Sequence, residues 1–198
     1  HKNTGLFAVT AGATIQNVQT EGIITVDSAE SGNSYCGALV AQNMGSSLTI
    51  TGCSTNVTIT YAGNYTKDSK YYVGGLVGEI TAGGANEGTL TMTGNTISGS
   101  IELKTPADTS VSDACMGGMI SSIFRSNEKD NNKRIISPDN FTLDLSNTTV
   151  SGLKLISSAT KSMGGLLGYE WNNVAVTWKN VVVKENASLT SNGNANFG

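Results

Sequence analysis

Cysteine and histidine most often carry metal and nucleophile chemistry, and this chain of 198 residues holds few of them. His1 is its only histidine, which makes a Ser-His-Asp triad implausible. Cys36, Cys53 and Cys115 follow no Cys-x-x-Cys spacing, which excludes the common zinc patterns. Either two of them form a disulfide and one stays free, or all three are small buried side chains, and we favour the second interpretation. We therefore predict no metal site and no cofactor.

Carboxylates are the other candidates for catalysis or calcium binding. Asp27, Glu79, Glu102, Asp144 and Glu170 occupy different positions in the repeat described below. Glu79 and Glu170 come closest to matching, but they fall one and two residues after a glycine-rich phrase, so their side chains should point in opposite directions. The calcium-binding nonapeptide Gly-Gly-x-Gly-x-Asp is absent. We predict that the chain is not an enzyme.

Polar inserts at 62–70, 104–113 and 124–139 offer a different chemistry, that of ligand contact. The longest holds the densest charge of the chain, and Tyr61, Tyr65, Tyr71 and Tyr72 gather near the first. Inserted loops often carry binding residues, and exposed tyrosines suit carbohydrate or protein contact. A solvated excursion without a partner is the simpler interpretation. The predicted ligand-binding residues are Tyr65, Tyr71, Arg125, Lys129, Lys133 and Arg134.

The composition limits the elements that can position these residues. With 24 Gly and only 2 Pro, the chain favours many short strands and turns. Its 38% hydrophobic and 14% charged residues suffice for a narrow continuous core and argue against disorder. The 12 basic residues are scattered and the net charge is -3, which argues against nucleic acid as a partner. No apolar run is long enough for membrane insertion in this segment.

An internal repeat organises the chain. A glycine-apolar phrase recurs at 35–40, 72–78, 115–120 and 162–168, with a degenerate copy at 4–8, and residues 196–198 look like the start of a sixth. Two period-2 segments follow each phrase, first at 48–51, 90–93, 141–145 and 174–178, then at 57–60, 97–103, 150–155 and 181–189. Each unit is thus predicted to contain three strands, with one buried face.

A turn residue lies between the two period-2 segments of each repeat. Asn tolerates the left-handed backbone that such a turn needs. Stacked at one corner, Asn side chains can form a ladder of amide hydrogen bonds, which Cys53 would interrupt. The predicted corner residues are Asn17, Cys53, Asn95, Asn147 and Asn180.

Successive phrases are 37, 43 and 47 residues apart, counted between Ala38, Gly75, Gly118 and Gly165. A propeller blade has a similar length. The length variation falls in inserts, however, and no Asn-Gly or Asp-Gly hairpin signal joins neighbouring strands. We predict an all-β fold, a right-handed parallel β-helix (β-solenoid) of about five coils with lateral loop insertions.

The phrases at 74–78 and 164–168, each followed by an alternating strand and an Asn turn, resemble the GLUG-type repeats of bacterial surface proteins. The phrase at 117–121 departs from that pattern. The resemblance implies a single β-solenoid fragment, residues 1–198, of a larger secreted or cell-wall-attached protein. It implies a non-catalytic adhesive or spacer module whose partner is a host or bacterial surface protein or carbohydrate. The alternative is a non-catalytic repeat region of a large secreted hydrolase.

Overall fold

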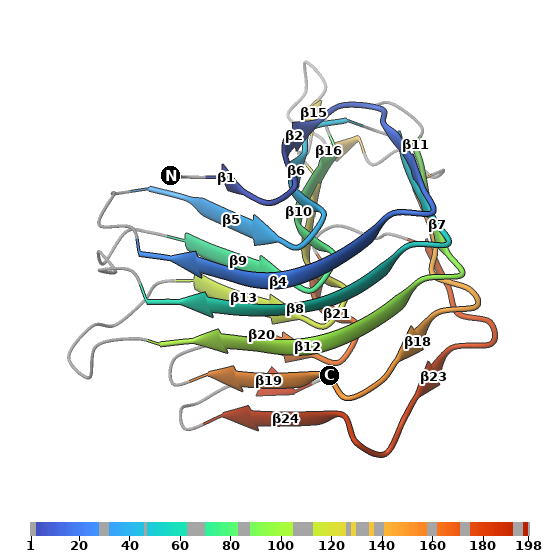
Figure 1. The fold of residues 1–198 in the computed structure, drawn as a ribbon. Helices are drawn as coiled ribbons and strands as arrows, with labels where there is room; N and C mark the ends of the chain where they lie inside the picture. Colours follow the sequence, from blue (N-terminus) through green and yellow to red (C-terminus); the bar gives the residue numbers. More distant parts are fainter. Residues whose placement is uncertain are drawn as a thin grey trace.

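Stacked β-strands make up every regular element of the described chain. The computed structural model describes residues 3–27, 32–45, 47–62, 70–82, 88–104, 113–125, 128–129, 135–136, 141–157, 162–170, 175–191 and 196–197. The strands form a right-handed parallel β-helix whose coils descend from the N-terminus (Figure 1). The predicted fold class is confirmed, and the propeller is excluded because neighbouring coils pair in parallel.

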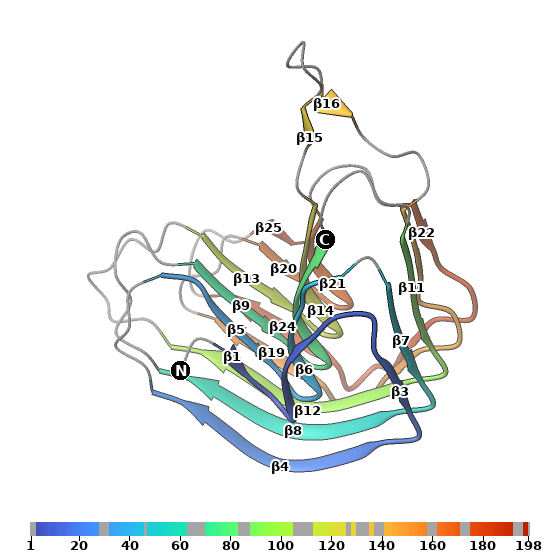
Figure 2. The same cartoon turned by 90° about the horizontal axis from the view of Figure 1, so that it is seen from above.

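Four parallel sheets run along the axis, so that each coil contributes to four faces (Figure 2). Sheet A holds β1 (Asn3–Thr4), β5 (Ser34–Gly37), β9 (Lys70–Gly74), β13 (Asp113–Gly117), β20 (Ser162–Gly164) and β25 (Asn196–Phe197). Sheet B holds β2 (Phe7–Thr10), β6 (Val40–Asn43), β10 (Val77–Ala82), β14 (Ile120–Arg125) and β21 (Leu167–Glu170).

The period-2 segments form the other two sheets. Sheet C holds β3 (Thr14–Gln16), β7 (Ser47–Thr51), β11 (Gly88–Thr93), β17 (Phe141–Asp144) and β22 (Ala175–Thr177). Sheet D holds β4 (Gln19–Val26), β8 (Ser54–Tyr61), β12 (Thr96–Leu103), β18 (Thr149–Val150), β19 (Lys154–Ser157), β23 (Val182–Val183) and β24 (Ser188–Ser191). One antiparallel pair, β15 (Glu128–Lys129) and β16 (Ile135–Ile136), lies outside these sheets.

The glycine phrase is two strands and not one, so the predicted unit of three strands is wrong. Its first half belongs to sheet A and its second half to sheet B, and the chain bends sharply between them. At Gly37, Gly74, Gly117 and Gly164 a Cβ atom would overlap the carbonyl oxygen of the residue three positions later. Only glycine lets the backbone approach itself this closely. The outer faces of sheets A and B therefore meet at a re-entrant angle (Figure 2).

The core is a continuous stack of apolar side chains inside the four sheets. Ile50, Leu76, Met92 and Leu143 are fully buried, as the alternation predicts. Leu166 and Val176, which we also expect to face the core because they lie in the glycine phrase at 162–168 and the period-2 segment at 174–178, are only partly buried. They lie in the last complete coil that the structure describes. The start of a sixth phrase is also confirmed, since β25 pairs with β20.

A parallel coil built on this repeat also requires equivalent glycines to align along the axis, and they do so. The amide of Gly75 donates to the carbonyl of Gly117 at 3.2 Å, and the amide of Gly118 donates to that of Gly164 at 3.0 Å. A Cβ atom on Gly75 would overlap the carbonyl of Gly118, and one on Gly118 that of Gly165. Equivalent glycines therefore stack directly from coil to coil.

The corner between sheets C and D has left-handed residues at a single register position. Asn17, Asn147 and Asn180 have φ values of 56°, 58° and 54°, as predicted. Cys53 and Asn95 lie one position further along, so their assignment to the corner is wrong. The Asn180 amide donates to Oδ1 of Asn147 at 3.0 Å on the outside. At this corner, the left-handed residues of the five coils are Asn17, Gly52, Gly94, Asn147 and Asn180.

Cys53 and Asn95 instead belong to a second, buried polar ladder beside this corner. Nδ2 of Asn95 donates to the carbonyl of Ile50 at 2.9 Å, while its Oδ1 accepts from the amide of Cys53 at 2.9 Å. Cys53 Sγ in turn donates to the carbonyl of Ile15 at 3.8 Å. Cys53 thus continues a coil-to-coil ladder and does not interrupt one.

The core assignment predicts a large effect of truncating Leu143. We expect Leu143→Ala to lower the free energy of unfolding by about 2 to 5 kcal/mol, because apolar contacts are lost and a cavity remains. Thr142→Ala, at the adjacent exposed position, should change it by no more than about 0.5 kcal/mol. Urea unfolding followed by circular dichroism measures both. Equal effects would contradict the inward orientation of Leu143.

The inner ladder predicts that replacing Asn95 lowers the free energy of unfolding more than replacing a left-handed Asn at the corner. Asn95→Ala removes the partners of one buried amide and one buried carbonyl, each worth about 1 to 3 kcal/mol when left unsatisfied. Asn147→Gly removes an exposed side chain at a φ that glycine adopts freely, and should cost far less. The midpoints of urea unfolding compare the two variants. A greater loss for Asn147→Gly would contradict this account of the ladder.

Candidate functional site

The structure describes only part of the predicted ligand-binding set. Tyr65, Lys133 and Arg134 lie outside the described residues. Arg125 is the last residue of β14 and pairs with Ala82 of the preceding coil, so it belongs to sheet B and not to the insert. Lys129 lies in β15, whose antiparallel partner is β16. That hairpin stands away from the stacked coils (Figure 2).

Tyr71 is a core residue, and its prediction as an exposed ligand contact is wrong. Its side chain is only 1% exposed and meets the equally buried ring of Tyr61 edge to face, with ring centroids 5.3 Å apart. Tyr71 shares its parity in β9 with Val73, whose side chain is also buried. Tyr72, one position later, lies on the opposite face of sheet A.

A polar hollow of about 210 Å³ lies where the outer faces of sheets A and B meet. Sheet A contributes Tyr35, Tyr72 and Lys70, and sheet B contributes Gln42, Glu79 and Thr81. The rings of Tyr35 and Tyr72 stack from coil to coil, with centroids 5.5 Å apart and planes 7° from parallel. The re-entrant angle thus brings an aromatic column from one sheet against a polar row from the next.

Glu79 lines this hollow and is only 5% exposed. Its Oε1 accepts from Thr81 Oγ1 at 2.7 Å and from Gln42 Nε2 at 3.3 Å, while its Oε2 accepts from Ser122 Oγ at 3.4 Å. Gln42 Oε1 accepts from Asn3 Nδ2 at 3.2 Å. A row of polar side chains, one from each of four successive coils, therefore runs along the angle.

The electrostatics of the hollow are dominated by burial. Desolvation raises the pKa of the Glu79 carboxyl above its ordinary value, although hydrogen bonds from Thr81, Gln42, Ser122 and Tyr35 oppose that shift. Burial also raises the pKa of the Tyr35 hydroxyl, and the nearby Glu79 charge adds to the effect. A carboxyl with a perturbed pKa in a surface hollow marks a candidate functional site.

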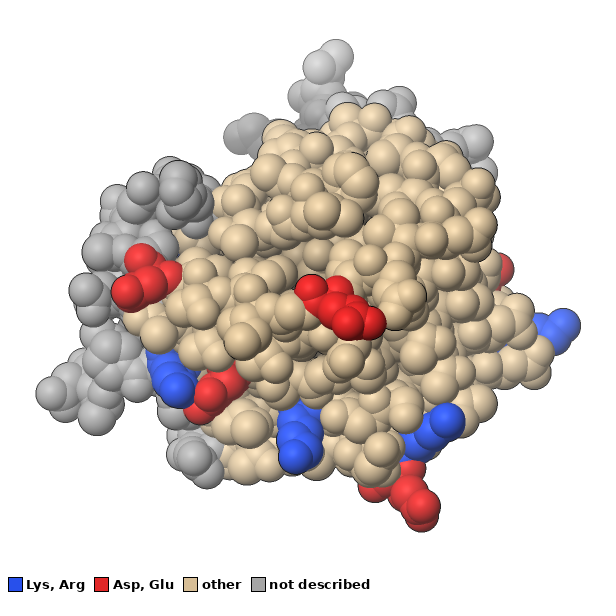
Figure 3. All heavy atoms as spheres, viewed as in Figure 1, with Lys and Arg blue, Asp and Glu red and all other residues tan. Residues whose placement is uncertain are grey.

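The other features that could carry chemistry are the cysteines, possible metal ligands and the surface charge. Cys36, Cys53 and Cys115 are buried and none of them forms a disulfide, which confirms the favoured interpretation, and burial raises the pKa of Cys36 to about 12. Among the described residues no group of three metal-ligating side chains occurs, and no helix has the length and apolarity needed to cross a membrane. On the face shown in Figure 3, the coloured charges of both signs are scattered and form no basic patch.

The sequence identifies Glu79 as a candidate carboxylate but does not indicate which residues surround it. The predicted offset from Glu170 is confirmed, since Glu79 shares a register with Ser122 and Tyr169 whereas Glu170 pairs with Ile123. Applying the alternation across Lys70–Gly74 would have placed Tyr72 outward and Tyr71 inward. Nothing in the period-2 pattern indicates that the outer faces of two sheets converge, so the hollow had no signal in the sequence.

We compared the chain with protein families, curated proteins and solved structures. No family model matches the chain, and no curated protein or solved structure is significantly similar to it.

The buried carboxyl predicts a pH dependence of stability. Because the folded-state pKa of Glu79 is raised, the folded protein holds this proton more tightly than the unfolded chain. The contribution is fully present below the unfolded pKa, about 4.3 for Glu, and is lost as pH rises through the folded value. Glu79→Gln should flatten this decline in the free energy of unfolding, measured by urea titration between pH 4 and pH 8.

Glu102→Gln on sheet D is the matched control, because it removes a carboxyl that pairs with Lys104 at 3.3 Å on the outer surface. It should leave the decline in place. An unchanged decline in Glu79→Gln would show that this carboxyl is not destabilised by folding.

Proposed function

We propose that this chain is a non-catalytic adhesive or spacer module of a secreted or cell-surface bacterial protein, which contacts a host or cell-surface ligand through its lateral inserts. The observation that carries the proposal is that the solenoid keeps its register on both sides of its longest insert. Before the insert, Ile123 of β14 pairs with Ile80 of the coil above. After it, Leu143 of β17 pairs with Leu90 of that same coil.

Because the register continues across the insert, the stacked strands form a scaffold and the insert is a separate part that the scaffold presents. Each outward side chain of a strand must fit its neighbours in the coils above and below, which leaves little freedom to shape a protruding surface. The insert escapes this restriction, and long insertions cost little extra loop entropy. Its described part is the hairpin of β15 and β16, which stands clear of the stack (Figure 2). Lys129 of that hairpin, together with Lys133 and Arg134 from the sequence between its two strands, supplies the charge for contact.

The test is removal of the insert. Replacing Ser126 to Ser137 by a short Gly-Ser linker should leave urea unfolding cooperative, because the flanking strands pair within the solenoid. The same change should weaken binding of the labelled chain to cultured epithelial cells and to immobilised extracellular-matrix proteins by about tenfold or more.

The matched control replaces residues 83–87, the equivalent connection between β10 and β11 in the preceding coil, by a Gly-Ser linker of the same length. It should leave binding unchanged. Loss of cooperative unfolding on removing Ser126 to Ser137 would make the insert a structural element, and full retention of binding would show that the inserts are not the contact surface. A chain that binds neither cells nor matrix proteins would contradict the adhesive role.

A further inference from the structure

The hollow between sheets A and B has a chemistry that the lateral inserts do not explain. Among the residues that the structure describes, its walls carry an ammonium group on Lys70 and a carboxylate on Glu79, together with amide and hydroxyl groups from Asn33, Gln42 and Thr81. The Glu79 carboxylate would repel an anionic ligand, and the Lys70 ammonium group would repel a cationic one. A neutral ligand that both donates and accepts hydrogen bonds avoids both conflicts.

The Glu79 carboxylate is built into the site, and two of its hydrogen bonds there are long. The donors Gln42 Nε2 and Ser122 Oγ lie at 3.3 and 3.4 Å, beyond the 2.7 to 2.9 Å or so that is usual for hydrogen bonds to charged groups. Hydroxyl groups of a ligand can supply shorter bonds to a carboxylate in a desolvated hollow, where such bonds are stronger than in water. The side chain is held in place by Thr81 at 2.7 Å, so it does not have to be ordered on binding.

The aromatic column makes one wall of the hollow rigid and apolar. Because the rings of Tyr35 and Tyr72 stack on each other, their edges and the Tyr35 hydroxyl border the hollow. The Asn33 amide donates to that hydroxyl at 3.1 Å and fixes its position. A volume of about 210 Å³ is smaller than the roughly 300 Å³ at which pockets for drug-sized ligands begin, which suits one or two rings of a longer chain.

We propose that this hollow is a binding site for a neutral saccharide, in which Glu79, Gln42 and Thr81 hydrogen-bond vicinal hydroxyl groups while the ring edges of the Tyr35 and Tyr72 column make apolar contact with the sugar. The site is built from regular strands of the second and third coils and does not require the insert between β14 and β17. It therefore holds or fails independently of the role proposed for the inserts.

The experiment is a titration of the isotope-labelled chain, followed by amide chemical shifts in NMR. The probes are three neutral tetrasaccharides (cellotetraose, mannotetraose and N-acetylated chitotetraose), a cationic deacetylated chitosan tetramer, anionic tetragalacturonate and an uncharged capped tetrapeptide. At least one neutral saccharide should shift amides of β5, β6, β9 and β10 in a saturable way. The variant that lacks Ser126 to Ser137 should show the same shifts.

Two variants test the residues. Glu79→Gln keeps the shape of the side chain and removes its charge, and Tyr35→Phe removes only the hydroxyl and keeps the ring stack. Each should weaken saccharide binding, Glu79→Gln by about tenfold or more, because hydrogen bonds to charged groups contribute most. Thermal unfolding shows that each variant is folded, and the second variant carries the test if the first does not fold.

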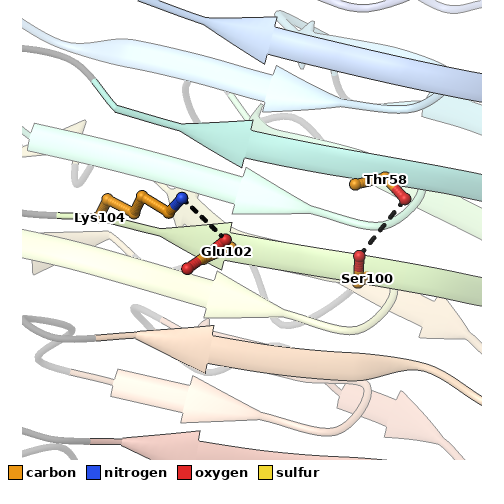
Figure 4. Close-up of polar contacts among 4 residues, drawn as sticks. All are labelled: Thr58, Ser100, Glu102 and Lys104. Atoms are coloured by element: carbon orange, nitrogen blue, oxygen red, sulfur yellow. Dashed lines mark hydrogen bonds and ion pairs between the residues drawn. The ribbon is translucent and has the colours of Figure 1, made fainter.

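The controls lie on the outer face of sheet D, where Ser100 contacts Thr58 and Glu102 pairs with Lys104 (Figure 4). Glu102→Gln and Ser100→Ala should bind like the parent chain. The proposal is overturned if no neutral saccharide shifts the amides of β5, β6, β9 and β10, or if a charged oligosaccharide or the capped peptide binds the hollow in preference. It is also overturned if Glu79→Gln and Tyr35→Phe both bind the saccharide with unchanged affinity.

Discussion

The close approach of the backbone to itself at the ends of β5, β9, β13 and β20 in sheet A is the constraint on which this structure depends. Gly37, Gly74, Gly117 and Gly164 occupy points where any Cβ atom would overlap a carbonyl oxygen of the same coil. The chain can therefore fold back between sheets A and B only at glycine. Because equivalent glycines stack along the axis, the bend is repeated in register, and the cross-section keeps its re-entrant angle from coil to coil.

That angle turns two ordinary outer faces into the walls of one hollow. Outward side chains of a flat parallel sheet contact water, but those of sheets A and B face each other, and Glu79 is buried although it lies on an outer face. Burial raises its pKa and makes its hydrogen bonds to Thr81 and Gln42 matter energetically. The same geometry explains how a row of polar side chains extends over four coils without entering the core.

Much of the fold follows from the sequence because it is set by local pattern. The alternation of apolar residues identified sheets C and D and the buried Leu143, and the spacing of the glycine phrases identified the coils. The bend within the phrase was missed, because its steric cause lies in contacts three residues ahead and not in periodicity. Tyr71 was placed outside for its residue type, although its parity with Val73 places it inside. At the corner, Gly52 and Gly94 replace Asn, since either residue type can adopt the left-handed φ.

The repeat also shows where chemistry can differ between coils. At the bend every coil from the second to the fifth has glycine, since the backbone permits nothing else. Two positions into sheet B, the register-equivalent residues are Gln42, Glu79, Ser122 and Tyr169, which share neither charge nor size. The frame is thus the same in each coil while the side chains on it are free to vary. In a solenoid of this kind, a specific site is therefore confined to one or two coils. Here the candidate site lies in the second and third coils, which carry the Glu79 carboxylate and the stacked Tyr35 and Tyr72.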